Sequence, residues 1–258
     1  MIEAHERTLS KVPAVTLGFW IIKILATTLG ETGGDTVTMT LDWGYLAGTA
    51  LFAAVLVGLV VAQILSTRFH PVLYWVTIVA STTFGTTMAD FADRSLGIGY
   101  TGGSTLLLIC IAAVLALWYR TEGTVSVNTV STPRVEAFYW AAITSSQTLG
   151  TALGDWLADT GGLGYEGGAL VFAAGLAVVV ALYYRTQVSR VGLFWAAFIL
   201  TRPLGATVGD FLDKPVANGG LNLSRPLASA VIAVLIVAAI ILLPQRAGQH
   251  PGSEAVKL

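Results

Sequence analysis

Charged side chains are scarce in this chain of 258 residues: Asp, Glu, Lys and Arg make up 11% of it, whereas 55% of its residues are hydrophobic. A soluble globular domain carries about a quarter charged residues. The shortage excludes an ordinary soluble domain and indicates an integral membrane protein, so the lipid bilayer is its first expected partner. No basic cluster indicates nucleic-acid binding.

The sequence also lacks the residues that several kinds of functional site require. Cys110 is the one cysteine, so an intramolecular disulfide is impossible. The three histidines lie far apart, and no Cys or His pair has metal-ligand spacing. No Gly-rich phosphate loop followed by Lys is present, and no Ser, His and Asp arrangement is visible. We therefore expect no enzyme and no ATP-driven transport. We expect no resident cofactor, and a divalent metal ion would be a substrate.

Eight apolar segments are candidates for membrane spans, since a spanning helix needs about 20 apolar residues. They cover residues 12–32, 46–66, 72–91, 101–119, 135–157, 168–184, 191–212 and 226–243. The segments 101–119 and 168–184 are short for a full crossing, so these helices begin earlier or stand nearly upright.

A spaced Trp, Gly and Asp motif repeats four times, with Gly ten and Asp fifteen residues after Trp. The sets are Trp20/Gly30/Asp35, Trp75/Gly85/Asp90, Trp140/Gly150/Asp155 and Trp195/Gly205/Asp210. A repeat with two spans returns to its starting side, so all four have the same orientation. We therefore expect an all-α membrane protein of eight transmembrane helices, built as four parallel two-helix repeats with pseudo-symmetry about the membrane normal. The repeats cover about 12–67, 71–121, 134–186 and 190–243 of a single domain, 1–245.

Lys and Arg near the span ends predict the orientation. Nine of them lie at the termini or after the second helix of a repeat, and three lie after the first helix. Both termini, including a tail at 246–258, are therefore expected in the cytoplasm. Ten of the fifteen acidic residues lie on the other side.

The first helix of each repeat concentrates its polar residues on one face. At 100° per residue, offsets 0, 3, 7, 10, 11, 14 and 15 from Trp fall within a sector of about 140°. This face also carries Lys23, Glu31, Gln147 and Arg202. A cation inside an apolar helix costs at least about 2.5–3.5 kcal/mol, so Lys23 and Arg202 need partners. If the first and fourth repeats are neighbours, Glu31 or an Asp supplies the countercharge, in a structural ion pair or in a substrate or gating site.

Packing is the favoured role of the repeated Gly and Trp. Each Gly is followed four residues later by Gly or Ala, a pattern that lets membrane helices approach closely. Each Trp lies three to eight residues inside its segment, and we favour contact with the neighbouring repeat over contact with a substrate.

The four Asp residues allow two interpretations. They lie about 30 Å along their helices, near the outer membrane boundary. Either they are solvated helix ends, or they form a ring of carboxylates lining an outer vestibule. Such a ring would bind Mg²⁺, Mn²⁺ or Ca²⁺ through Asp35, Asp90, Asp155 and Asp210, or would carry protons.

The four spaced tryptophans resemble those of a family of bacterial integral membrane proteins with four tandem repeats, each containing two transmembrane regions and a characteristic tryptophan. The likeness covers about residues 12–243. It implies the architecture and a bacterial inner membrane, but no activity or site.

The acidic outer mouth, the polar inward face and the buried cations favour a transporter or exporter of small cations. The substrate would be a divalent ion such as Mn²⁺ or Mg²⁺, with or without proton coupling. A non-transporting membrane scaffold or sensor is the alternative, and a membrane-embedded enzyme the third. The eight spans could close around a central axis or assemble as a homodimer.

Overall fold

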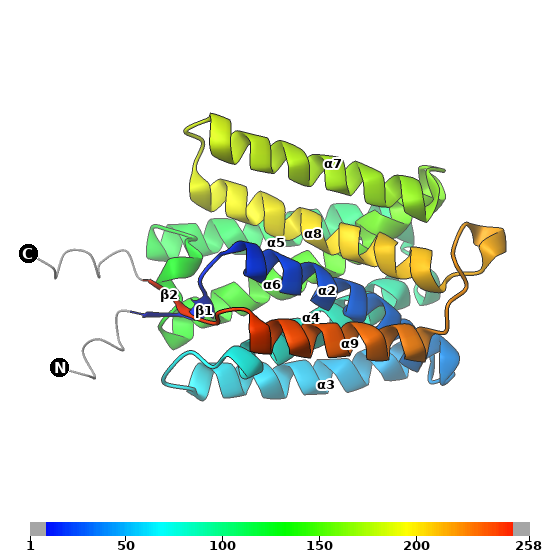
Figure 1. The fold of residues 1–258 in the computed structure, drawn as a ribbon, viewed down its shortest axis with the longest axis horizontal. Coiled ribbons are helices and arrows are strands. Elements are labelled where there is room, and N and C mark those ends of the chain that lie inside the picture. The colour runs from blue at the N-terminus through cyan, green and yellow to red at the C-terminus, as the bar shows by residue number, and fades with distance from the viewer. Residues whose placement is uncertain (1–8, 250–258) are drawn as a thin grey trace, which may run out of the picture.

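Eight α-helices account for most of residues 9–249, the part of the chain that the computed structural model describes (Figure 1). The helices are α2 (Leu17–Asp35), α3 (Gly44–Leu65), α4 (Pro71–Asp90), α5 (Gly99–Glu122), α6 (Pro133–Asp155), α7 (Gly164–Arg185), α8 (Arg190–Asp213) and α9 (Arg225–Leu242). Two short strands, β1 (Leu9–Pro13) and β2 (Ala247–Gln249), pair antiparallel.

Capping residues determine where the first helix of each repeat begins. The hydroxyls of Thr16, Thr132 and Ser189 accept hydrogen bonds from backbone N–H groups in the first turns of α2, α6 and α8. Helix α4 has no such cap but starts at Pro71, whose missing N–H costs nothing in a first turn. These signals make the repeat boundaries visible in the sequence.

The helices form two concentric layers. The first helices of the repeats, α2, α4, α6 and α8, pack side by side in this cyclic order, and α8 closes the inner ring against α2. Each second helix lies outside and packs mainly on the first helix of the next repeat: α3 on α4, α5 on α6, α7 on α8, and α9 on α2. The first and fourth repeats are therefore neighbours.

A π-helical turn follows the Asp in three repeats, at Thr36–Thr40, Phe91–Ser95 and Trp156–Thr160. In the fourth repeat the α-helix runs on to Asp213. The chain then turns into α3, α5 and α7 through Gly44, Gly99 and Gly164, which have φ of 66–75°. This left-handed backbone favours glycine and explains why Gly-Tyr recurs there.

Within residues 9–249, six helices are long and apolar enough to cross a membrane: α3, α4 with its π-helical turn, α5, α7, α8 and α9. Six of the eight predicted spans are thus supported by their length and apolar composition. Helices α2 and α6 are more polar, since α2 contains Lys23, Glu31 and Asp35, and α6 contains Glu136 and Gln147. Both lie in the inner ring, where neighbouring helices cover much of their surface.

Several expected boundaries were wrong. Residues 12 and 13 belong to strand β1, because β2 offers them a pairing partner. The segments 101–119 and 168–184, by contrast, do begin earlier, as one of the two expectations had it: α5 starts at Gly99 and has 24 residues, and α7 starts at Gly164 and has 22. Part of the expected tail, Ala247–Gln249, is strand β2; its remainder, 250–258, lies outside the described residues.

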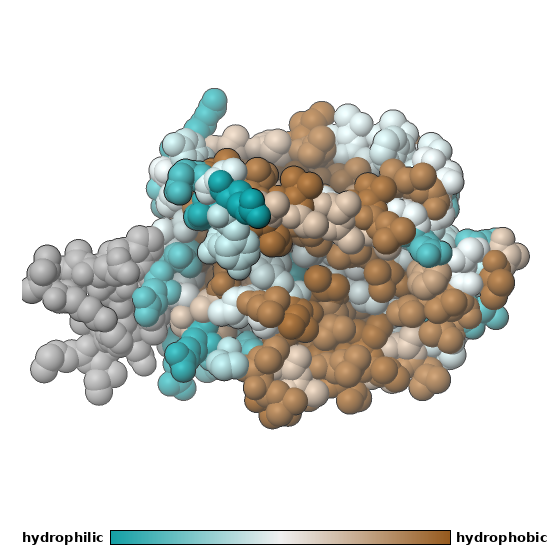
Figure 2. All heavy atoms as spheres, turned by 45° about the horizontal axis from the view of Figure 1, so that its top comes forward, coloured by the Kyte–Doolittle hydropathy of each residue, from teal (hydrophilic) through white to brown (hydrophobic). Residues whose placement is uncertain are grey.

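The outer helices carry the exposed apolar side chains. Val57, Leu106, Leu170 and Val234 are each about 60% exposed or more, one on each outer helix. Brown apolar atoms cover much of the middle of the face shown in Figure 2, and teal hydrophilic residues lie mainly toward its ends. This is the surface that a lipid bilayer would cover.

Candidate functional site

Residues at the same offset from the Trp of their own repeat lie at similar levels of the inner ring, so the polar core is layered. The Trp end is filled by aromatic rings. Trp75, Trp140 and Trp195 are buried, and the residue before each Trp is also aromatic. Ring centroids lie 5.4 Å apart for Phe19 and Trp75 and 5.8 Å apart for Tyr74 and Trp140.

The ring of Phe194 lies 5.7 Å from that of Trp20, so the same kind of contact also joins the fourth repeat to the first. The hydroxyls of Tyr74 and Tyr139 are 2.6 Å apart. The repeated tryptophans therefore lie in packing contacts, and the aromatic residue at offset −1 is a part of the motif that the sequence analysis missed.

The repeated glycines make room for one side chain each. A Cβ at Gly30, Gly85, Gly150 or Gly205 would collide with the residue at offset 7 of the next repeat: Thr82, Gln147, Arg202 and Thr27 respectively. Glycine at offset 10 is thus a steric requirement at all four interfaces of the ring. This is the close approach that the small-residue pattern predicted.

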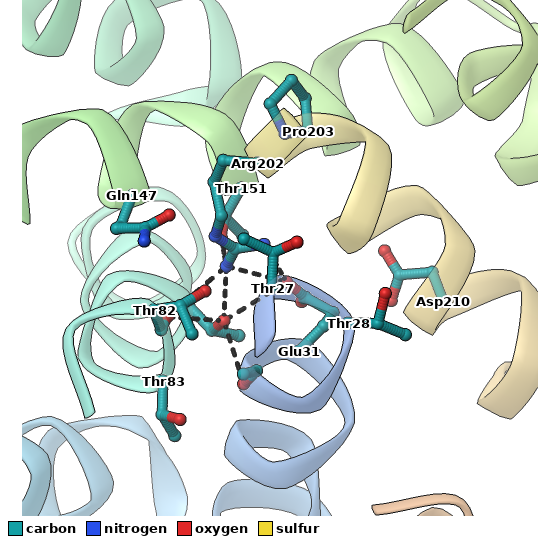
Figure 3. A network of polar contacts seen from close by, with 12 residues as sticks. Thr27, Thr28, Glu31, Thr82, Thr83, Gln147, Thr151, Arg202, Pro203 and Asp210 are labelled. Atoms are coloured by element: carbon teal, nitrogen blue, oxygen red, sulfur yellow. Dashed lines mark hydrogen bonds and ion pairs between the residues drawn. The ribbon is translucent and has the colours of Figure 1, made fainter. Parts of the chain in front are cut away.

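Arg202 crosses the centre of the ring (Figure 3). Its guanidinium, fully buried, donates to Glu31 Oε2 from Nη1 at 3.1 Å and from Nη2 at 3.0 Å. It also donates to Thr86 Oγ1 at 2.7 Å and to Thr151 Oγ1. Glu31, Thr86 and Thr151 share offset 11 in the first three repeats, so one arginine joins all four inner helices at this level.

Lys23 lies between Arg202 and the aromatic layer. Its Nζ is 3.5 Å from Gln147 Oε1 and 4.2 Å from the centre of the Phe198 ring. It is fully buried, and no carboxylate among the described residues lies within ion-pair distance of it. The expected countercharge, Glu31, pairs with Arg202 instead.

The four Asp residues are buried, with at most 4% of each exposed. The interpretation as solvated helix ends is wrong, because a π-helical turn in three repeats, and the rest of α8 in the fourth, continues beyond the Asp. They form two pairs, each bridged by a cation. Lys214 Nζ is 3.0 Å from Asp210 Oδ1 and also contacts Asp35 Oδ2.

The second pair is bridged by Arg94. Its Nε is 2.9 Å from Asp90 Oδ1, and its Nη2 is 3.4 Å from Asp155 Oδ2. Arg94 and Lys214 both have offset 19, in the second and fourth repeats. A bridging cation is thus present in every second repeat, so this level of the ring has two-fold pseudo-symmetry although the ring has four repeats. Neither residue was among the predicted site residues, although their equal offsets were a usable signal.

One of the pairs has a third carboxylate beside it. Oxygens of Glu31, Asp35 and Asp210 all lie within 4.8 Å of one another. Asp35 Oδ1 and Asp210 Oδ2 are buried and have no hydrogen-bond partner. Oxygen donors at this spacing suit a hard cation. The structure thus brings together Glu31, Asp35 and Asp210 from the predicted set, and places Asp90 and Asp155 in a separate pair.

A pocket of about 620 Å³ lies at this end of the ring. Residues of all four repeats line it, including Met39, Arg94, Asp159 and Lys214 at offset 19. Burial lowers the pKa of Lys214, but the carboxylates of Asp210, Asp35 and Asp213 outweigh this effect and hold it well above its ordinary value. Lys214 lines the pocket, whereas Glu31, Asp35 and Asp210 do not.

The fold and the polar core define a class: a helical protein with membrane-spanning helices, in which four repeats surround a charged centre. The family model named Repeat of Unknown Function (DUF347) matches residues 18–69, 73–124, 138–189 and 193–246. The chain belongs to this family, and its internal repeat is confirmed. No curated protein and no solved structure matches the chain.

Proposed function

We propose that this protein transports small cations, and that its substrate is a divalent ion such as Mn²⁺ or Mg²⁺. The observation that carries the proposal is the buried group of Glu31, Asp35 and Asp210, with two carboxylate oxygens that lack a partner. Hard divalent cations prefer such oxygen ligands.

The charge balance around this group supports a cation. Besides Glu136, which pairs with Lys11, seven carboxylates of the described core are at most 8% exposed: Glu31, Asp35, Asp90, Asp93, Asp155, Asp210 and Asp213. Among residues 9–249, four cations form ion pairs with members of this set, namely Arg94, Arg202, Lys214 and Arg225. Uncompensated buried charge is costly, so protons or bound cations must supply the remainder. Replacement of protons on these carboxylates by a bound cation would couple cation movement to proton movement.

Transport requires that the polar core be enclosed in the membrane. We propose that all eight helices cross a bacterial inner membrane, with the ring axis along the membrane normal and both termini in the cytoplasm. Nine Lys and Arg residues at the terminal side against three at the opposite side support this orientation. A reporter that fluoresces only in the cytoplasm should be active at either terminus, and an inactive fusion at both ends would contradict the orientation.

Reconstituted protein tests the transport proposal. We expect liposomes containing the protein to take up Mn²⁺ or Mg²⁺, followed with an entrapped metal-sensitive dye. Asp210→Asn should lower the initial rate by roughly tenfold or more, because it removes a charged ligand. The matched control is Glu166→Gln, an exposed acid at the same end of the molecule, which should leave the rate unchanged.

Absence of Mn²⁺, Mg²⁺, Ca²⁺ and proton flux from folded protein would overturn the proposal. Tolerance of Asn at both Asp35 and Asp210 would do the same. Either result would favour the alternative of a membrane scaffold or sensor, in which the polar face serves only for helix packing.

A further inference from the structure

The two bridged Asp pairs are pseudo-equivalent, yet they differ in three respects. Asp35, Asp210 and Lys214 come from the first and fourth repeats, and Asp155, Asp90 and Arg94 are their counterparts from the third and second. Each counterpart has the same offset from its Trp. Each of Asp35, Asp210 and Lys214 can therefore be compared with an equivalent residue elsewhere in the same chain.

The first difference is the third carboxylate. Glu31 lies beside Asp35, whereas Thr151 has the same offset beside Asp155. The second difference is in the oxygens. Asp35 Oδ1 and Asp210 Oδ2 are buried without a partner, and neither Asp90 nor Asp155 has an oxygen in that condition.

The third difference is the bridging cation. Arg94 presents a planar guanidinium that contacts both carboxylates of its pair. Lys214 presents an ammonium on a flexible four-carbon stem, which can be withdrawn at less geometric cost than a guanidinium fork. The Lys214 backbone is held by hydrogen bonds to Asp210 O and from Asn222 N, so movement is restricted to the side chain. The adjoining pocket, which Lys214 lines, provides space for it.

The charge of the site without Lys214 matches a divalent cation. Glu31, Asp35 and Asp210, with the neighbouring Asp213, carry four negative charges. Arg202 neutralises one through Glu31, and Arg225, which pairs with Asp35 and Asp213, neutralises another. Two negative charges remain. With its single charge, the ammonium of Lys214 leaves the site under-neutralised, whereas a divalent cation in its place would neutralise it.

We propose that Lys214 is a tethered cation that competes with the transported divalent ion for Glu31, Asp35 and Asp210. This inference rests on the proposed function. Entry of the ion displaces the ammonium into the pocket, and return of the ammonium expels the ion. The Asp90, Arg94 and Asp155 group does not exchange and holds the other half of the ring together.

Binding of Mn²⁺ to the purified full-length protein tests this competition. Lys214→Gln should bind Mn²⁺ roughly tenfold or more tightly than the unchanged protein, because the competitor is gone. It should also slow Mn²⁺ release in a dilution experiment. Arg94→Gln is the matched control, and we expect it not to tighten Mn²⁺ binding. Lys214→Arg keeps the charge, and we expect it to abolish Mn²⁺ exchange while the protein remains folded.

The outcomes separate this inference from the proposed function. Mn²⁺ binding by the unchanged protein with no gain in Lys214→Gln overturns the competition alone. Equal gains in Mn²⁺ affinity in Lys214→Gln and Arg94→Gln also overturn it. If Lys214→Gln does not fold, normal Mn²⁺ exchange by Lys214→Arg overturns it instead. No Mn²⁺ binding by any of these proteins overturns the proposed function itself.

Discussion

At the scale of single residues, Arg202 makes the most demanding contacts in the core. Its guanidinium is fully buried and binds one carboxylate and two threonine hydroxyls from three other helices. Removing one member of a buried ion pair costs about 3–5 kcal/mol, mainly because the other charge is left unpaired. The pair with Glu31 therefore makes folding depend on both residues together.

We expect Arg202→Met to destabilise the protein by about 3–5 kcal/mol, and Glu31→Gln to do so by a similar amount. The double variant should lose less stability than the sum of the single losses, since no charge is left unpaired. Thermal unfolding midpoints in detergent measure this. Arg190→Met, at an exposed position of the same helix, is the control and should have little effect. Strictly additive losses would contradict a direct pair.

At the scale of the helices, the ring depends on contacts between offset 10 and offset 7. A Cβ on Gly85 would lie 2.8 Å from the Gln147 carbonyl carbon and 2.9 Å from the Thr148 nitrogen. Backbone atoms cannot yield as a side-chain tip can. The glycine therefore determines how closely α4 and α6 approach.

Gly85→Ala should destabilise the protein by about 1–3 kcal/mol through overpacking. Gly58→Ala is its matched control, because Gly58 is also inside a helix but has nothing within 4 Å of its Cβ position. There the lower entropy of the unfolded chain should stabilise the protein by about 0.4–1 kcal/mol. Opposite shifts of the unfolding midpoint would support the packing role, and equal shifts would count against it.

The helices also show what the sequence could predict. The face with Lys23, Glu31 and Arg202 was predictable, because a regular helix converts offsets into directions. Which outer helix packs where was not, since α3, α5, α7 and α9 are apolar on most sides and carry no distinguishing pattern. The burial of the Asp residues was missed because counting the rise along a helix gives a depth but not the loops that cover it. Arg94 and Lys214 were counted only as loop charges, since bridging two repeats is visible only in three dimensions.

At the scale of the whole molecule, the two ends of the chain complete the ring. Helix α9 packs on α2, and β2 pairs with β1. Lys11, in β1, forms a 2.5 Å ion pair with Glu136 at the start of α6. The backbone of Lys11 also donates to Val130 O, in the linker between the second and third repeats, which divides the chain into two halves. Trp75 and Trp140 are 65 residues apart, whereas the tryptophans within each half are 55 apart, so this linker is ten residues longer. It therefore contributes to the closure at this end.

Closure of the ring predicts a cross-link between residues far apart in sequence. The hydroxyls of Thr32 on α2 and Ser229 on α9 are 2.9 Å apart. With Cys110 replaced by Ala, Thr32→Cys combined with Ser229→Cys should form an intramolecular disulfide under mild oxidation, because disulfide Cβ atoms lie about 3.5–4.5 Å apart. After proteolysis between the two halves, gel electrophoresis should show them still joined until a reductant is added. Thr32→Cys alone, also with Cys110 replaced by Ala, is the control, and its halves should separate because it has no second cysteine. Separation of the halves in the double-cysteine protein would show that α9 does not lie on α2 and that the ring is open.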